Sequence, residues 1–492
     1  MIGQVDTIRS ASLDPSPATD HTHRRPLGVG VLGVGWVLVA TWLQLVRGPG
    51  HRAPDVIWAE DGGVFLNQAM RHSLWHNLVV PHAGYLQVIA RLLTQPAAHL
   101  PLFWVAIWLA VSAAIVVALI SLVVWFASVG VVQSLWARLL LTALVPVLPQ
   151  AGFEVNAAVC DVHWYLIYAA FWVLLAAPSS WRGQLGASAV VVLAALSDPL
   201  TALVLPAAAL GLMRASRRDL ALMAPVALCS ALGLQIWFHL TRAVGFRSSP
   251  TTLGDLPAIY GLRVVLSAVT GDRMLGLVYM TLGLPIVAAT GLLAVIGLAA
   301  LMRQADRTAQ LVAAVCLVIS VALLFVTLGL RGTSGIVDRD GFTLNGSRYT
   351  IMPLLMLWTA VLVLLDRLEI RRHVGLAGPS MAVPGVIGIV APAFLGMQVL
   401  SDWGGNTVRS AGPSWSADLR TAAATCQQPP GRRAVQPTPL VGEVQGKGSA
   451  PVVPGPDDVT IVVAPQPPPG KPLLFAVVIP CASIRNDAPG HP

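Results

Sequence analysis

Long apolar runs without a charge constrain this chain most strongly. Residues 27–46 are twenty consecutive uncharged residues, and residues 102–129 form a longer run of the same kind. A helix of about twenty apolar residues is long enough to cross the hydrocarbon core of a bilayer, which is about 30 Å thick. The runs therefore predict an all-α polytopic membrane protein.

The composition supports this prediction. The chain of 492 residues is 55% hydrophobic and 11% charged, whereas soluble proteins contain about 25% charged residues. The net charge of +8 does not indicate a nucleic-acid partner, because no basic surface domain with interleaved aromatic residues accompanies it. The arginines fall mainly at the ends of apolar runs, where they set orientation and contact anionic lipids.

The apolar segments predict about eleven transmembrane helices in the cytoplasmic membrane. We expect residues 1–23 to be a disordered cytoplasmic N-terminus and residues 24–400 to form the transmembrane domain. An odd number of spans then places the Pro-rich segment 401–492 outside the cytoplasm. The expected spans are 27–46, 102–126, 138–149, 163–177, 185–197, 200–213, 219–241, 275–302, 309–330, 349–365 and 380–400.

The charged residues are distributed unevenly across this topology. Most carboxylates fall in or near segments assigned to the outer side, and the inner loops contain few. A transporter more often places ionisable residues at mid-membrane on broken helices, so this clustering favours chemistry at the outer surface. The arginines are nearly balanced between the two sides. Either this balance weakens the topology, or the outer arginines have another task, such as phosphate binding.

The segment 58–63 (WAEDGG) places two adjacent carboxylates, Glu60 and Asp61, shortly after the first span. The following residues are typical of an amphipathic helix in the membrane interface, with Trp58 and Trp75 at its ends. Adjacent residues of a helix diverge by about 100°. One carboxylate would then be the catalytic group, and the other a cap or a metal ligand. The alternative is that Asp61 only caps the helix and Glu60 is solvated.

A second short interfacial helix is expected before residue 102, and it would contain His82, Tyr85 and Arg91. These side chains either face a cavity or serve as an interface aromatic and a snorkelling arginine. Two interfacial segments between the first and second spans are unusual for a simple helical bundle.

Polar residues also occur at the expected outer ends of later spans. His163, with Asp161 two residues before it, belongs either to a metal site, to a carboxylate-oriented base or to a polar cavity wall. Arg348 and Tyr349 open a span from the outside. The arginine there would meet a lipid phosphate, or the pair would serve as a membrane anchor.

The C-terminal segment 401–492 has a different character. It contains sixteen of the 37 prolines, and residues 459–463 and 473–479 are typical of short strands joined by a Pro-rich loop. We therefore expect a small β-rich appendage. Cys426 and Cys481 lie in this segment, and an exported segment permits a disulfide between them. The alternative is two unpaired thiols.

The whole arrangement resembles the GT-C superfamily of membrane glycosyltransferases. A first helix is followed by an acidic outer loop with two interfacial helices, many further spans and a late extracytoplasmic appendage. Residues 58–62 (WAEDG), 84–86 (GYL), 163–164 (HW) and 414–415 (SW) resemble a group of actinobacterial membrane proteins of this type. The similarity extends over most of residues 27–481.

The resemblance implies an inverting transfer of a sugar from a polyprenyl-phosphate donor to a cell-envelope glycan or glycolipid, outside the cytoplasmic membrane. Glu60 or Asp61 would deprotonate the acceptor hydroxyl. Arg348, with Arg91 or Arg331, would stabilise the departing phosphate. Some members of the superfamily use a divalent metal and others do not, so a metal cofactor stays an open question.

Two other classes of function stay open. A transporter or flippase of lipid-linked intermediates would depend on polar residues in the middle of helices and not on Glu60 and Asp61. A non-catalytic scaffold would use the segment 401–492 to bind partners. The sequence contains no Walker A motif, dinucleotide-binding glycine motif, kinase signature or G-x-S-x-G motif.

Overall fold

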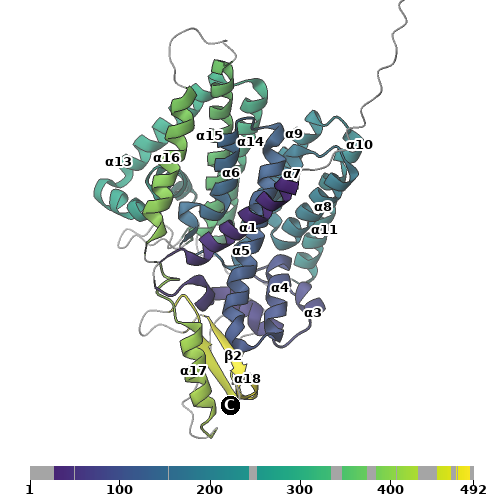
Figure 1. Cartoon of the computed structure of the whole chain (residues 1–492), viewed down its shortest axis with the longest axis vertical. Coiled ribbons are helices and arrows are strands. Elements are labelled where there is room, and N and C mark those ends of the chain that lie inside the picture. The colour runs from purple at the N-terminus through teal and green to yellow at the C-terminus, as the bar shows by residue number, and fades with distance from the viewer. Residues whose placement is uncertain are drawn as a thin grey trace, which may run out of the picture.

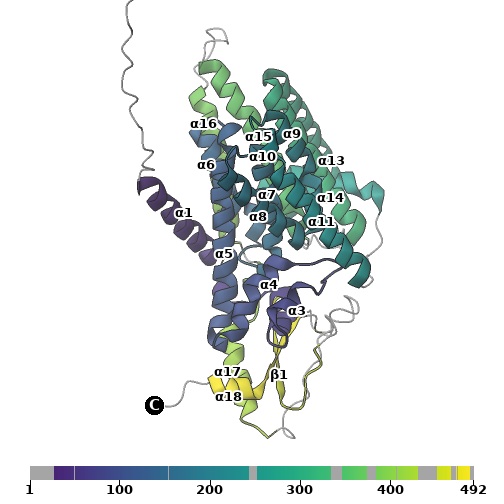
Figure 2. The same cartoon turned by 90° about the vertical axis from the view of Figure 1, so that its right-hand side faces the viewer.

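A computed structural model shows a mostly helical bundle with a small two-stranded sheet at one end (Figure 1, Figure 2). It describes residues 27–48, 50–152, 154–242, 252–333, 346–373, 384–405, 407–429, 452–466, 473 and 475–487. The expectation of a disordered segment at 1–23 lies outside the described residues.

A helix covers each of the segments expected from the apolar runs. Within the described residues, seven helical segments are long and apolar enough to cross a membrane, while residues 30–46 and 199–214 form shorter apolar helices. The number of eleven spans therefore stays a prediction. The helices of the bundle are α1 (Leu27–Val46), α5 (Leu102–Ala127), α6 (Leu135–Val147), α7 (Val162–Ala176), α8 (Trp181–Ser197), α9 (Leu205–Arg214), α11 (Met223–Arg242), α13 (Ser267–Gln304), α14 (Arg307–Arg331), α15 (Arg348–His373) and α16 (Pro384–Trp403).

Helix α7 forms the centre of the bundle. All of its residues except the last are buried, and it packs against α5, α8, α9 and α15. A helix that is apolar on every side is expected where protein surrounds it completely. The single-sided amphipathic pattern of a soluble bundle is therefore absent from this helix.

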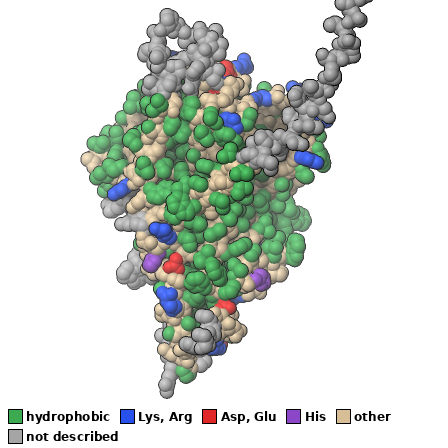
Figure 3. Space-filling view, viewed as in Figure 1, with side chains coloured by type: hydrophobic (Ala, Val, Ile, Leu, Met, Phe, Trp, Pro, Cys, Tyr) green, Lys and Arg blue, Asp and Glu red, His purple; other side chains and the backbone are tan. Residues whose placement is uncertain are grey.

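The outer surface of the bundle is apolar. Hydrophobic side chains cover the middle of the face shown in Figure 3, and charged side chains lie mostly toward its two ends. Leu32 and Trp42 of α1 and Leu293 of α13 are among the large apolar side chains that are more than half exposed. Water would disfavour so large an apolar surface, whereas lipid chains do not. These are the properties of a multi-pass membrane protein.

The connection between α1 and α5 differs from the expected pair of interfacial helices. It contains a π-helical turn, η2 (Asp61–Leu66), the short helices α2 (Asn67–Ala69), α3 (Leu74–Leu78) and α4 (Val88–Thr94), and two 3₁₀ turns, η1 (Ala53–Asp55) and η3 (Gln95–His99). Trp75 is 78% exposed, as an interface residue would be, but Trp58 is only 3% exposed. The prediction of Trp58 as an interface residue is therefore wrong.

This connection differs from the expected helices because it packs against the C-terminal segment, a contact that hydropathy cannot reveal. The side-chain amide of Asn67 donates a hydrogen bond to the carbonyl of Ala476 and accepts one from the N–H of Val478, at 2.8 and 3.0 Å. The amide thus satisfies the backbone of the C-terminal strand as a neighbouring strand would. The polar side of the expected helix therefore faces protein at Asn67, whereas Arg71 and His72 are exposed.

The C-terminal segment folds onto this connection. Strands β1 (Asp458–Val462) and β2 (Ala476–Pro480) pair in antiparallel orientation, close to the two predicted strands. Two helices that the sequence did not predict accompany them, α17 (Trp415–Cys426) and α18 (Cys481–Asp487). A disulfide joins Cys426 to Cys481, which is the predicted pair.

We predict that replacing both Cys426 and Cys481 by serine loosens the sheet and the connection beneath it. A disulfide that closes a loop of this kind contributes about 2–4 kcal/mol. Hydrogen–deuterium exchange should become faster in β1, β2 and residues 57–67, with α7 unchanged. The Cys229→Ser variant, at an exposed free cysteine, is the control. Unchanged exchange in residues 57–67 would contradict the coupling.

Candidate functional site

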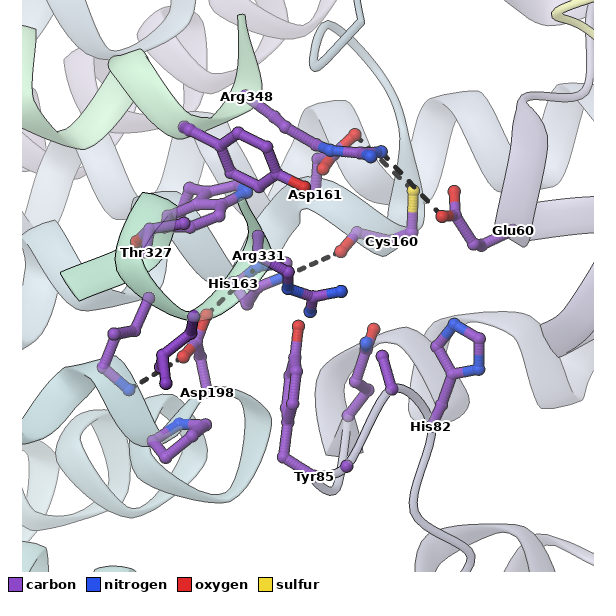
Figure 4. A pocket seen from close by; sticks show the side chains of 18 of the residues that line it. Glu60, His82, Tyr85, Cys160, Asp161, His163, Asp198, Thr327, Arg331 and Arg348 are labelled. Atoms are coloured by element: carbon purple, nitrogen blue, oxygen red, sulfur yellow. Dashed lines mark hydrogen bonds and ion pairs between the residues drawn. The ribbon is translucent and has the colours of Figure 1, made fainter. Parts of the chain in front are cut away.

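A cavity of about 660 Å³ lies at the end of the bundle that carries the C-terminal segment (Figure 4). Its walls come from the turn before η2, residues 82–87, the first turns of α7 and α15, the residues after α8, and the last turns of α11 and α14. Helix ends that are far apart in sequence therefore meet there. Seven of the nine predicted catalytic or binding residues line it, namely Glu60, His82, Tyr85, His163, Arg331, Arg348 and Tyr349.

Glu60 reaches the cavity from a strained turn. The preceding residue, Ala59, has a φ of +28°, which is costly for a residue with a Cβ atom. The Glu60 side chain is 16% exposed, and its Oε1 lies 3.8 Å from Nη1 of Arg348. Its Oε2 is buried and accepts no hydrogen bond from the described residues. Because buried carboxylate oxygens usually have a partner, this oxygen is available to a bound molecule.

Asp61 does not line the cavity. Its carboxylate accepts hydrogen bonds from the N–H groups of Val159 and Cys160, at 2.9 and 2.7 Å. These residues begin a 3₁₀ turn, η6 (Val159–Asp161), that leads into α7. Asp61 therefore caps a different segment from the one expected, and its position outside the cavity favours Glu60 as the catalytic residue of the predicted pair.

Burial also changes the protonation of Asp61. It raises the pKa of this carboxyl from its ordinary value of 3.8 to about 6, although Arg409 and the two N–H groups favour the ionised form. Desolvation is the largest of these effects, as expected for a carboxyl group away from water.

The C-terminal segment packs directly on residues 57–63. The backbone of Ala464 donates one hydrogen bond to this turn and accepts another. A Cβ atom on Gly62 would lie 2.9 Å from Cγ2 of Val477, which is too close for real side chains. The glycine after the two acidic residues thus permits the close approach of strand β2.

Glu154 positions Arg348, the first residue of α15. Its carboxylate accepts hydrogen bonds from the N–H groups of Gly346 and Arg348 and from the hydroxyl of Ser347, at 3.3, 3.1 and 3.2 Å. A carboxylate at a helix N-terminus satisfies free N–H groups and is favoured by the helix dipole. The Arg348 guanidinium also lies 5.2 Å from the ring of Tyr349.

A histidine–carboxyl pair forms one wall of the cavity. Nδ1 of His163 lies 2.6 Å from the carbonyl oxygen of Cys160, which assigns the ring proton to Nδ1 because a carbonyl only accepts. Nε2 faces Oδ2 of Asp198 at 3.3 Å. Burial raises the pKa of Asp198 to about 7, with the Leu200 N–H and Arg331 opposing the shift.

The segment from His82 to Tyr85 is a tight turn and not the expected helix. His82 and Tyr85 exchange two backbone hydrogen bonds, and the two residues between them, Ala83 and Gly84, have φ of +53° and +92°. Such a turn reverses the chain within two residues and brings both the His82 and Tyr85 side chains to the cavity (Figure 4). The Arg331 guanidinium lies 6.0 Å from the Tyr85 ring.

Arg91, predicted to bind the lipid phosphate, does not line the cavity. Its guanidinium donates hydrogen bonds to Oε1 of Gln68 and the carbonyl of Val80, both at 2.7 Å, and lies 5.4 Å from the Phe65 ring. These contacts stabilise the connection between α1 and α5, and the position of Arg91 gives no support to the predicted role in phosphate binding. Burial, followed by the positive charges of three arginines including Arg91, lowers the pKa of His82 to about 3.

Two other arginines at this end of the bundle also have structural roles. Arg47 donates hydrogen bonds to the two carbonyls that follow α6, and Arg409 to those of residues 156 and 157. Both side chains are buried. The task of these two arginines is therefore to pair backbone carbonyls in the connections between helices, and not to bind phosphate.

Asp198 is the main cavity residue that sequence reasoning did not select as a site residue. Its signal was the sequence Ser197-Asp198-Pro199, in which a carboxylate follows an apolar run at a helix break. His239, in the last turn of α11, was also missed; its Nδ1 lies 2.7 Å from the carbonyl of Gly84. A polar residue in the last turn of an apolar helix is the corresponding signal.

Within the described residues, no group of three or more His, Cys, Asp or Glu side chains could hold a metal ion. Asp161 and His163 both line the cavity, but they face different partners. Asp161 lies 3.5 Å from the thiol of Cys160, whereas His163 contacts Asp198. The suggested metal-ligand pair is therefore not assembled.

Comparison with known proteins yields no relative for this chain. No protein-family model, no curated protein and no solved structure matches it. The function is consequently inferred from the chemistry of the cavity and from the resemblance of the short sequence motifs.

We predict that Asp61→Asn changes how stability depends on pH. Because the pKa of Asp61 is raised to about 6 from 3.8, its proton stabilises the fold fully below about pH 4, and this contribution is lost as the pH rises through about 6. The melting temperature of the wild type should fall relative to that of Asp61→Asn across this interval. Asp219→Asn, at an exposed site, should leave the profile unchanged. A constant difference between the wild type and Asp61→Asn would refute the prediction.

Proposed function

We propose that this protein is a membrane glycosyltransferase of the GT-C type, which transfers a sugar from a polyprenyl-phosphate donor to a hydroxyl group of a cell-envelope glycan or glycolipid. One observation carries the proposal. A buried oxygen of Glu60, without a hydrogen-bond donor among the described residues, belongs to a cavity that Arg331 and Arg348 also line. A carboxylate base and fixed positive charges are the groups that such a transfer requires.

The apolar part of the cavity supports a lipid-linked donor. Leu200, Leu240 and Leu330 line the cavity together with the charged residues. Leu240 and Leu330 are also 77% and 63% exposed on the apolar outer surface of α11 and α14. A polyprenyl chain bound along these leucines remains in apolar surroundings from the cavity to the bilayer, which makes its transfer from lipid to protein inexpensive in free energy.

In the proposed reaction, Glu60 accepts the proton of the acceptor hydroxyl as its oxygen attacks the anomeric carbon. The bond from this carbon to the phosphate oxygen breaks, and its electron pair remains on the phosphate. Arg331 balances the charge that develops there, and Arg348, paired with Glu60, adds positive charge from the other side of the cavity. Attack from the face opposite the phosphate inverts the anomeric configuration.

The proposal places the cavity on the extracytoplasmic side of the cytoplasmic membrane, with a cytoplasmic N-terminus and an exported C-terminal segment. The disulfide of Cys426 and Cys481 fits an oxidising compartment. Cytoplasmic loops are enriched in arginine and lysine, and the end of the bundle opposite the cavity carries Arg214, Arg217, Arg218, Arg303, Arg307 and Arg367.

The two other classes of function are less well supported. The charged residues of the long helices lie toward the helix ends and not at their centres, whereas a transporter more often carries ionisable groups at mid-membrane. The C-terminal segment packs on the turn that carries Glu60. This contact supports a structural role for it within the site in place of a separate partner-binding role.

We predict that Glu60→Gln abolishes most of the transfer activity. Glutamine preserves the size of the side chain but cannot accept the proton, and a positioned general base contributes about 10²–10⁴-fold. The measurement compares envelope glycans in a strain that lacks the protein after complementation with the wild type, Glu60→Gln or Asp61→Asn. At a temperature at which both variants are present in equal amounts, Asp61→Asn, whose amide oxygen can still accept one of the two N–H groups, should restore more of the glycans than Glu60→Gln does. Full restoration by Glu60→Gln would exclude Glu60 as the base.

We predict opposite accessibility for two introduced cysteines. In a Cys229→Ser background, the Trp75→Cys variant should react with a membrane-impermeant maleimide in intact cells, because Trp75 lies on the cavity side and is 78% exposed. The Arg217→Cys variant, at an exposed site on the opposite end, should react only after permeabilisation. The reverse pattern would place the cavity in the cytoplasm and contradict the proposal.

A further inference from the structure

The cavity has two ends with different chemistry. In Figure 4, Glu60 and His82 lie on one side of the drawn residues, Asp198 and Thr327 lie on the other, and Arg331 is between them. The side with Glu60 contains a paired carboxylate and guanidinium. The side with Asp198 contains the contact between His163 and a carboxyl group described above.

The Asp198 side is the one next to the apolar wall. Leu200 follows Asp198 by two residues, Leu330 precedes Arg331, and all four line the cavity. In a lipid-linked sugar, the phosphate is the first polar group after the hydrocarbon chain. A chain along these leucines therefore brings its phosphate beside Arg331 and Asp198, and its sugar extends toward Glu60.

The contacts of Asp198 favour a protonated carboxyl group beside the expected position of the lipid phosphate. The ring proton of His163 is used by the Cys160 carbonyl, so the nitrogen facing Oδ2 of Asp198 at 3.3 Å carries a lone pair. Only a proton shared between these two atoms turns their contact into a hydrogen bond. The other oxygen, Oδ1, accepts the N–H of Leu200 at 2.8 Å, which fixes the orientation of the carboxyl group.

The surroundings of Asp198 keep this proton exchangeable near neutral pH. Burial raises its pKa to about 7, and the positive charge of Arg331 from α14 limits the rise. The other titratable groups that line the same cavity around it are His163 from α7, Tyr85 from the turn and His239 from α11. None of these three carries a negative charge in its ordinary state near neutral pH.

We propose that Asp198, oriented by His163, is the general acid that protonates the departing lipid phosphate. This inference rests on the proposed function. The bond between the anomeric carbon and the phosphate oxygen breaks with its electron pair on oxygen, and the proton shared by Asp198 and His163 moves to the phosphate. The acceptor proton goes to Glu60. Both groups return to their starting states by exchange with solvent after the products leave.

The physical reason is the charge of the leaving group. The donor is a phosphodiester with one negative charge, and its departure without a proton would produce a monoester with two. Leaving a second negative charge at the apolar end of the cavity is costly. The second ionisation of a phosphate monoester has a pKa of about 6, so a proton from a carboxyl group with a pKa near 7 can be shared with it on departure.

The test uses the full-length protein in phosphatidylcholine nanodiscs and farnesyl phosphate, a short polyprenyl monophosphate that mimics the leaving group. Isothermal titration calorimetry in two buffers with different ionisation enthalpies gives both the affinity and the protons taken up on binding. The variant is Asp198→Asn, which retains an oxygen to accept the Leu200 N–H. Asp219→Asn is the matched control, while farnesol and empty nanodiscs correct for partition into lipid.

At about pH 8 the wild type should take up about one more proton per bound farnesyl phosphate than Asp198→Asn does. Its affinity relative to that variant should fall by up to about tenfold per pH unit above about pH 7, because one linked proton has this effect. Asp219→Asn should behave as the wild type does. The general-acid role is overturned, and the lipid-phosphate site stands, under two joint conditions. The ratio of the wild-type affinity to that of Asp198→Asn is the same at every pH, and the two proteins take up equal numbers of protons on binding. If no protein binds farnesyl phosphate beyond the farnesol control, the proposed function itself is overturned.

Discussion

The carboxylate of Asp61, bound to the N–H groups of Val159 and Cys160, joins the first connection of the chain to the start of its central helix. The rest of the site depends on this contact. It fixes residues 57–63 against α7 from one side, while strand β2 and Ala464 hold the same turn from the other. Because Asp61 is committed to the protein, the neighbouring Glu60 is directed into the cavity.

The same physical solution recurs at several helix starts of this bundle. The first N–H groups of a helix lack partners within it, and an apolar environment makes an unpaired group costly. Carboxylates from other segments accept these N–H groups in pairs and thereby connect two parts of the chain. Within the described residues, Asp61 and Glu154 do this at the starts of η6 and α15. Asp366 binds the two N–H groups just before α6, and Asp402 binds the two that follow the break at Gly271 in α13.

Glu60 differs from these carboxylates, which bind N–H groups of the protein. Among the described acidic residues, it has a buried oxygen that accepts no hydrogen bond. Its position at one end of a cavity, with exposed leucines and the Asp198–His163 contact at the other, is the basis for assigning a sugar to the first end and a lipid phosphate to the second. The apolar wall and the polar groups thus support a single amphipathic ligand better than two separate ones.

The sequence alone predicted the apolar helices and the two strands, because hydropathy and alternation are properties of local segments. It offered the disulfide between Cys426 and Cys481 as one of two alternatives, and the structure shows this bond. The sequence also predicted most of the site residues that line the cavity. The reason is that the ends of apolar helices lie at the two ends of a bundle, so polar side chains at these ends come together there. Only the tertiary structure distinguishes Glu60, which lines the cavity, from Asp61, which binds two N–H groups, because adjacent carboxylates are equivalent until distant N–H groups bind one of them. The same holds for Arg91, which pairs with Gln68 and the Val80 carbonyl, and for Asp198, whose partner His163 lies on another helix. Their roles depend on contacts between segments far apart in the chain, and no local pattern encodes such contacts.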